Sequence, residues 1–147
     1  HFRPKLILRE FNHCIQFEYE FRVFVFKNAV TAITQYNSMV YLPRLAQNTE
    51  AFESGIQRFW KEKIVAVMKE NGISSYVMDV ALVEKTKKKD EEAEELEENK
   101  EKEEEEELQF VLIEMNPFCT QAGAMLFDWK RDVKLMTSEP CTFRVLE

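Results

Sequence analysis

Near the C-terminal end, residues 110–118 read Phe110-Val111-Leu112-Ile113-Glu114-Met115-Asn116-Pro117-Phe118. Because this run is apolar and rich in β-branched and aromatic residues, it predicts a buried strand. Side chains alternate along a strand, so Glu114 and Asn116 lie on the same face. Pro117 has no backbone N–H and is expected to end the strand. A carboxylate beside a carboxamide at a strand end suits a hard cation such as Mg²⁺.

The composition indicates one domain, residues 1–147, with a hydrophobic core. The chain is 45% hydrophobic and includes 12 Phe but only 3 Gly, and it contains no Gly-rich phosphate loop. No apolar run approaches the roughly 18 residues of a membrane span, and no basic patch with interleaved aromatics indicates nucleic acid. The three widely spaced cysteines form no C-x-x-C pair and favour reduced thiols over a zinc site. We therefore expect a cytoplasmic protein that binds neither membrane nor nucleic acid.

The acidity of the chain comes from one segment. Residues 85–108 hold 13 acidic and 6 basic residues, which accounts for the whole net charge of −7, and the 14 acidic and 14 basic residues elsewhere cancel. Like charges cannot bury a core, so this low-complexity segment is predicted to be a solvated insert between two paired strands. Binding of a partner to the insert is an open alternative.

The remaining chain predicts an α+β fold with a mainly antiparallel sheet and one long packed helix. Strands are expected over 5–11, 19–26, 29–36, 75–83, 110–118 and 141–146. Residues 13–18 are expected to be a connection, Lys27-Asn28 a tight turn, and 120–129 a loop leading into a short helix. The long helix begins at a cap, Asn48 or Thr49, runs for about 22 residues with apolar side chains at helical spacing, and stops at Asn71-Gly72.

Asp79 extends the possible metal site to a second strand. It lies inside the apolar run 75–83, where a charge is costly to bury unless it is paired or bound to a metal. If this strand is the hairpin neighbour of 110–118, then Asp79, Glu114 and Asn116 converge. Each residue alone is a weak signal, because an Asp in a strand also occurs at edges or with a local hydrogen bond.

Glu20 and Arg22 share one face of the strand 19–26 by their spacing. Arg22 can hold a phosphate or an acyl-phosphate, and Glu20 can accept hydrogen bonds from a ribose. The alternative is an ion pair on that face, which contributes little to stability if it is exposed. Arg9 and Glu10, at the end of the first predicted strand, allow the same two interpretations.

Six short motifs together resemble one known family. In chain order they are L-I-L-R-E-F (6–11), E-F-R-V-F-V (20–25), I-T-Q-Y (33–36), V-M-D-V-A (77–81), I-E-M-N-P-F (113–118) and L-F-D-W (126–129). As a set, from Leu6 to Trp129, they resemble the cell division cycle protein 123 family, which belongs to the wider ATP-grasp group. The resemblance implies an ATP-grasp C-terminal subdomain that binds ATP and Mg²⁺. Because the sequence starts at His1 rather than Met, we expect an excised domain without the N-terminal subdomain.

The resemblance also implies roles for single residues. It makes Asp79, Glu114 and Asn116 the metal ligands, Glu20 the ribose contact, and Arg22 a catalytic contact to phosphate or substrate. It implies that Arg9, Glu10 and Phe11 lead into the adenine-binding hinge and that Gln35 lies at the site rim.

Two functions follow from the resemblance. Members of the named family assist assembly of the heterotrimeric translation initiation factor 2, so its subunits are possible partners. Other ATP-grasp branches are carboxylate–amine ligases, in which ATP phosphorylates a carboxylate and an amine displaces the phosphate. A binding domain that kept the fold and lost the nucleotide is a third reading, and whether the chain is an enzyme is left open.

Overall fold

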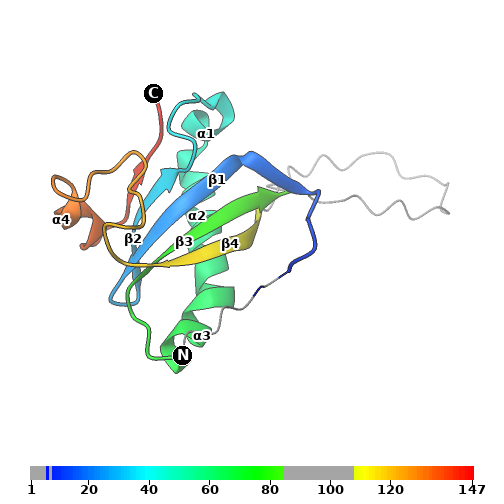
Figure 1. The fold of residues 1–147 in the computed structure, drawn as a ribbon. Helices are drawn as coiled ribbons and strands as arrows, with labels where there is room; N and C mark the ends of the chain where they lie inside the picture. Colours follow the sequence, from blue (N-terminus) through cyan, green and yellow to red (C-terminus); the bar gives the residue numbers. More distant parts are fainter. Residues whose placement is uncertain (1–5, 7, 85–107) are drawn as a thin grey trace, which may run out of the picture.

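A five-stranded sheet in the order β4-β3-β1-β2-β5 forms the centre of the computed structural model, which describes residues 6, 8–84 and 108–147 (Figure 1). Its strands are β1 (Ile15–Phe26), β2 (Ala29–Gln35), β3 (Tyr76–Val83), β4 (Gln109–Pro117) and β5 (Thr142–Arg144). The pairs β4–β3, β3–β1 and β1–β2 are antiparallel, and β5 is parallel to β2. The predicted α+β fold with a mainly antiparallel sheet is confirmed. Apart from Leu108, the predicted insert 85–108 lies outside the described residues.

A two-residue turn joins β1 to β2, as predicted. Lys27 and Asn28 have φ angles of 50° and 63°. Two consecutive positive φ angles give a type I′ turn, whose twist matches the twist of the flanking strands. The turn therefore keeps β1 and β2 in register close to their junction, where Phe26 pairs with Ala29.

The long helix is continuous from Thr49 to Glu70 but is not uniform. It consists of α2 (Thr49–Phe59), a π-helical turn η1 (Trp60–Ile64) and α3 (Val65–Glu70). It ends where Gly72 adopts a φ of +69°, as the Asn-Gly pair predicted. Capping by an Asn48 or Thr49 side chain was wrong, because Asn48 Nδ2 and Thr49 Oγ1 donate to carbonyls of the preceding turn. No helix of the described ranges is long and apolar enough to cross a bilayer.

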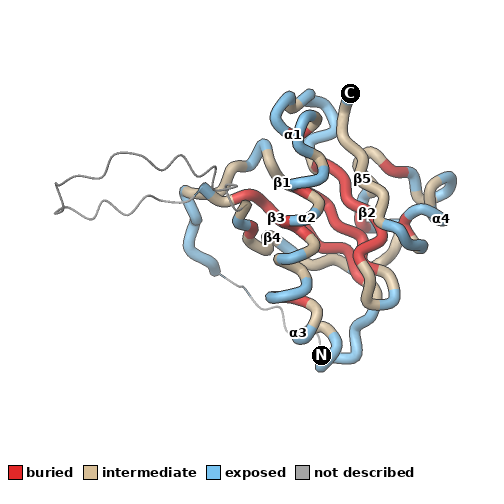
Figure 2. The backbone as a smooth tube through the Cα atoms, turned by 180° about the vertical axis from the view of Figure 1, so that it is seen from behind, coloured by how far each residue is buried: buried red, intermediate tan, exposed pale blue. Residues whose placement is uncertain are grey.

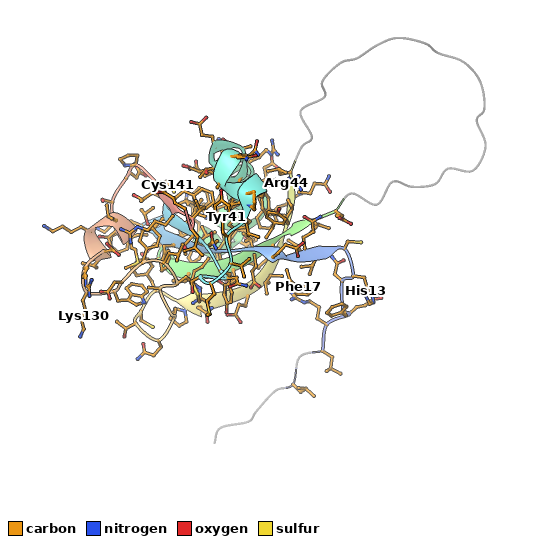
Figure 3. The ribbon with its side chains drawn as sticks, turned by 90° about the horizontal axis from the view of Figure 1, so that it is seen from above. His13, Phe17, Tyr41, Arg44, Lys130 and Cys141 are labelled. Atoms are coloured by element: carbon orange, nitrogen blue, oxygen red, sulfur yellow. The ribbon has the colours of Figure 1, made fainter. Side chains whose placement is uncertain are left out.

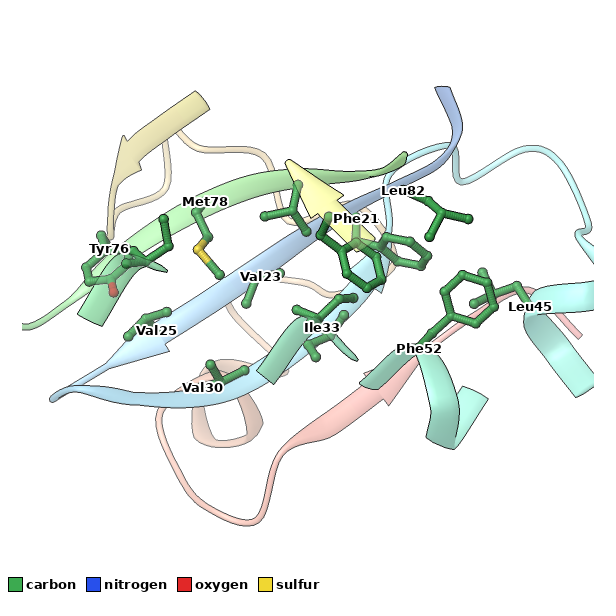
Figure 4. Close-up of a cluster of buried hydrophobic side chains, with 14 residues drawn as sticks. Phe21, Val23, Val25, Val30, Ile33, Leu45, Phe52, Tyr76, Met78 and Leu82 are labelled. Carbon is green, nitrogen blue, oxygen red and sulfur yellow. The ribbon is translucent and has the colours of Figure 1, made fainter. Parts of the chain in front are cut away.

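The helix covers one face of the sheet and encloses the main core (Figure 4). Phe52 and Ile56 of the helix are fully buried, and Phe52 lies 5.5 Å from the ring of Phe21 on β1. Figure 2 shows this buried centre running along the strands between the more exposed ends of the molecule. The alternating apolar residues of β1 thus fill the core that the sequence pattern indicated. The strands supply most of its buried members: Phe21, Val23, Val25, Val30, Ile33, Tyr76, Met78, Val80, Leu82 and Phe110.

The segment after β4 covers part of the opposite face. It contains the short helix α4 (Val133–Met136), and its residues Phe127 and Met136 are buried against Phe24 of β1. Trp129 Nε1 donates a hydrogen bond of 2.7 Å to the carbonyl of Ala122, which joins the two ends of this loop. The predicted loop and following short helix are therefore confirmed, and they lie beside the candidate site.

Several predicted boundaries were wrong. Residues 8–11 are not a strand, because their backbone pairs with none of the five strands and Arg9 contacts β4 through its side chain instead. Residues 15–18 belong to β1 rather than to a connection, although Ile15-Gln16-Phe17-Glu18 continues the apolar–polar alternation of this strand and was the available signal. The last strand spans three residues, not six, and the helix α1 (Pro43–Gln47) was missed although Pro43 suits a first helical turn.

The core contact of the long helix gives a first prediction. Phe52→Ala removes a fully buried ring and should lower the free energy of unfolding by about 3–5 kcal/mol. Val67→Ala, on the same helix at 55% exposure, is the control and should change it by less than about 0.5 kcal/mol. Urea denaturation of both variants measures the difference, and equal losses would contradict the proposed packing.

Cys141 gives a second prediction. Burial, followed by the nearby Glu53 carboxylate, raises the pKa of the Cys141 thiol from 9.0 to about 12. At pH 8 the reactive thiolate fraction should therefore be about 10⁻⁴ and should rise roughly tenfold per pH unit. Mass spectrometry after timed iodoacetamide treatment should show Cys141 modified more slowly than Cys14. Modification of both at the same rate would show that Cys141 is not shielded in this way.

Candidate functional site

A row of polar side chains crosses three strands on the face opposite the helix. The strand register places Arg22 of β1 opposite Asp79 of β3, and Asp79 opposite Glu114 of β4. A bulge makes this possible, because the register shifts between Asp79 and Val80 and passes over Ile113. The predicted convergence of the β3 and β4 side chains is confirmed as geometry, and Arg22 joins it.

Arg22 and Asp79 form a buried bidentate ion pair. Arg22 Nε donates to Asp79 Oδ1 at 2.8 Å, and Arg22 Nη2 donates to Oδ2 at 2.7 Å. Arg22 is 4% exposed and Asp79 0%. A carboxylate at this depth requires such compensation, so the cost that the sequence indicated for Asp79 is met by the guanidinium.

Glu114 and Asn116 form the outer part of the row. Asn116 Nδ2 donates to Glu114 Oε1 at 2.7 Å, which confirms that the two side chains share one face. Glu114 Oε1 lies 3.7 Å from Arg22 Nη2, and the Glu114 side chain is 53% exposed. A ligand arriving from solvent therefore meets Glu114 before it meets Asp79.

The charges here are not balanced, because Glu20, two residues before Arg22 on β1, brings the carboxylates to three against one guanidinium. Burial raises the pKa of Glu20, and the negative charges of Asp79 and Glu114 raise it further. The hydrogen bond from Asn116 lowers the pKa of Glu114, and contact with Asp79 lowers it further. Burial raises the pKa of Asp79 against the opposing effect of its bonds to Arg22, and those bonds raise the pKa of Arg22. A cation is the kind of ligand that this excess of negative charge attracts.

The donor set is compatible with Mg²⁺. Each oxygen of an ionised carboxylate has two lone pairs, so Asp79 retains acceptor capacity beyond its bonds to Arg22. Glu114 and the amide oxygen of Asn116 add two more oxygen donors of the type that Mg²⁺ prefers. Within the described ranges, no group of three or more His, Cys, Asp or Glu side chains is arranged to hold a metal ion, so Asn116 is a necessary member of this set.

The predicted hinge residues line an open hollow beside the β4 edge. Arg9, Glu10 and Phe11 border a volume of about 760 Å³ together with Phe17 of β1 and Val111 and Ile113 of β4. Arg9 donates to the carbonyls of Leu112 and Ile113 at 3.1 and 3.3 Å. Figure 3 shows the labelled His13 and Phe17 near the start of β1, beside this segment.

Gln35 does not belong to the cluster. It pairs with Phe21 in the strand register and therefore lies on the helix face, 1% exposed. Its amide nitrogen donates to the carbonyls of Asn37 and Val40, and its oxygen accepts from the backbone N–H of Leu146 at 2.8 Å. These bonds fix the loop after β2 and the C-terminal tail.

Two neighbours of Arg22 were missed by the sequence reasoning. Arg22 Nη1 donates to the carbonyl of Gly123 at 2.7 Å, and the guanidinium lies 5.1 Å from the centre of the Tyr36 ring. A backbone carbonyl in a loop carries no sequence signal, so Gly123 was not predictable. Tyr36 follows β2 directly, and its alternation with Thr34 was the available signal.

Comparisons with known proteins agree with this fold. The family model D123 matches residues 1–147. The chain belongs to the D123 family. The motif resemblance to the cell division cycle protein 123 family is thereby confirmed.

Two solved structures share the fold of this D123 family member. Cdc123 from Schizosaccharomyces pombe matches with a TM-score of 0.63 and 18% identity, over 99% of this chain and 50% of that one. A C-terminally truncated Cdc123 from the same organism matches with a TM-score of 0.62 and 19% identity, over 90% and 42%. The chain thus spans half or less of the structures that it matches. A search of curated proteins gives no match.

The buried ion pair gives a third prediction. Asp79→Ala leaves the Arg22 charge buried without its partner and should lower the free energy of unfolding by about 3–5 kcal/mol. Glu114→Ala on the neighbouring strand is the control, and it should cost less than about 1 kcal/mol because that side chain is 53% exposed. Urea denaturation distinguishes the two, and an equal cost would show that the pair does not support the fold.

Proposed function

We propose that this chain is the Mg-ATP-binding part of an ATP-grasp-type protein that acts as an assembly factor for translation initiation factor 2. The observation that carries the nucleotide part is the convergence of Asp79, Glu114 and Asn116 on one face, where Arg22 compensates Asp79 and the charges of Glu114 and Glu20 remain in excess. The assembly role, and initiation factor 2 subunits as partners, rest on membership of the D123 family.

The positions of the hollow and the carboxylates support one orientation of the bound nucleotide. Val111 of the hollow faces Ala81 on β3, which in turn faces Glu20 on β1, so the hollow and the carboxylates lie on neighbouring positions of one sheet face. We place the adenine in the hollow beside Arg9, Glu10 and Phe11, the ribose at Glu20, and the phosphates toward Glu114. Bound Mg²⁺ would neutralise phosphate charge, and Asp79, Glu114 and Asn116 would hold it.

The ligase alternative has less support from the geometry. It assigns to Arg22 the stabilisation of an acyl-phosphate, which requires N–H groups directed at the substrate. Three Arg22 N–H groups instead donate to Asp79 and Gly123 inside the protein. Release of ADP that depends on a particular carboxylate and amine would nevertheless establish the ligase.

Loss of the outer metal ligands gives a fourth prediction. Glu114→Ala combined with Asn116→Ala should lower the affinity of the intact protein for ATP, in the presence of Mg²⁺, by at least about tenfold, because ligands to the cation are lost. Titration calorimetry measures this. The control is Glu84→Gln, which changes a carboxylate next to β3 that binds Gln16 and lies outside the row. Unchanged affinity in the double variant would rule out the assigned metal site.

The partner is tested separately. A pull-down with the intact protein should recover initiation factor 2 subunits. If ATP binding supports assembly, the Glu114→Ala, Asn116→Ala double variant should recover less of them. Recovery of none of these subunits would contradict the assembly role and would leave the nucleotide site in place.

A further inference from the structure

We infer that Arg22 is a positioning residue, which holds Asp79 and the Gly123 loop in place around the metal site, rather than a contact to phosphate or substrate. This inference rests on the proposed metal site. It changes the role that family resemblance implies for this arginine.

The Arg22 guanidinium is bound to groups of the protein itself. Two of its N–H groups donate to the two oxygens of Asp79, and a third donates to the carbonyl of Gly123. The side chain is 5% exposed, and its face lies against the Tyr36 ring. A phosphate contact requires free donors, and three of the five guanidinium N–H groups already have partners within the protein.

The contacts of Arg22 hold the proposed metal ligand Asp79 in place. Binding of both carboxylate oxygens fixes the rotation of Asp79, so its remaining lone pairs keep one orientation. The positive charge also permits Asp79 and Glu114 to lie side by side, which like charges alone would oppose. Such support around a metal ligand typically changes metal affinity by roughly 10–100-fold when it is removed.

Arg22 also links the sheet to the loop after β4. Gly123 lies in the segment that follows β4, six residues after Pro117 ends the strand. Its bond to Arg22 ties this segment to β1 and β3 at the position of the metal ligands. One side chain thus joins β1, β3 and the loop, and it approaches β4 through Glu114.

The test compares Arg22→Lys with a matched arginine in the intact protein. Lysine keeps the charge, but its single ammonium group cannot form the bidentate pair with Asp79 and the bond to Gly123 together. The control is Arg144→Lys on β5, because Arg144 also forms a bidentate pair, with Asp132 at 2.6 and 2.9 Å, and donates to the Leu126 carbonyl. Thermal unfolding of both variants measures how much each change lowers stability, apart from any effect on binding.

The main readout is binding of Mn²⁺ to the nucleotide-free protein, followed by electron paramagnetic resonance. Arg22→Lys should weaken Mn²⁺ binding roughly 10–100-fold, and Arg144→Lys should leave it within twofold. Unchanged Mn²⁺ binding in Arg22→Lys would overturn the inference but not the proposed metal site. Failure of the unmodified protein to bind Mn²⁺ would overturn the proposed metal site, and the inference with it.

Nucleotide affinities distinguish positioning from phosphate contact. With Mg²⁺ saturating, Arg22→Lys should leave the ratio of ATP to ADP affinity unchanged, and selective loss of ATP affinity would overturn the inference. If Arg22→Lys does not fold, hydrogen exchange in the unmodified protein still tests the inference. The Arg22 Nε–H should stay protected from hydrogen exchange when Mg-ATP binds, and loss of that protection would show that Arg22 leaves Asp79 for the phosphates.

Discussion

The buried ion pair between Arg22 and Asp79 is the constraint on which the rest of the structure depends. Two ionised groups at 4% and 0% exposure are tolerated only when they satisfy each other. That requirement fixes β1 against β3, because a slip of one strand by one residue would turn its charge toward the apolar helix face and separate it from its partner. The bulge at Ile113 then brings Glu114 to the same position on β4. The ion pair and the bulge together therefore set the composition of the site.

The two faces of the sheet serve different purposes. The helix face is a continuous core in which Phe21, Phe52 and their neighbours are shielded from solvent. The other face carries a smaller apolar cluster where the segment after β4 covers it, around Phe24 and Phe127. Beyond that cover lies the polar row. The larger apolar cluster lies on the helix face, and the other face combines a smaller cluster with charges that a core would accept only in pairs.

Much of the site was accessible from the sequence because its signals are local. A charge inside an apolar strand marks Asp79, and strand alternation pairs Glu114 with Asn116 and Glu20 with Arg22. The roles were harder. Arg22 and Gln35 both carry polar groups that suit a ligand, yet their donors are used inside the protein, and Gln35 lies on the helix face. Residue type and spacing do not show whether a donor already has a partner.

The sequence by itself determined the types of the main elements, the β1–β2 turn, the extent of the long helix and the shared faces of Glu20 with Arg22 and of Glu114 with Asn116, because these depend on neighbours a few positions away. It also identified the family through its motifs. The tertiary structure decided that residues 8–11 stay irregular beside β4, that β5 runs parallel to β2, and that Arg22 reaches Asp79 and Gly123, which lie 57 and 101 positions away. These outcomes depend on which distant segments of the chain pack together, and local sequence patterns do not determine that choice.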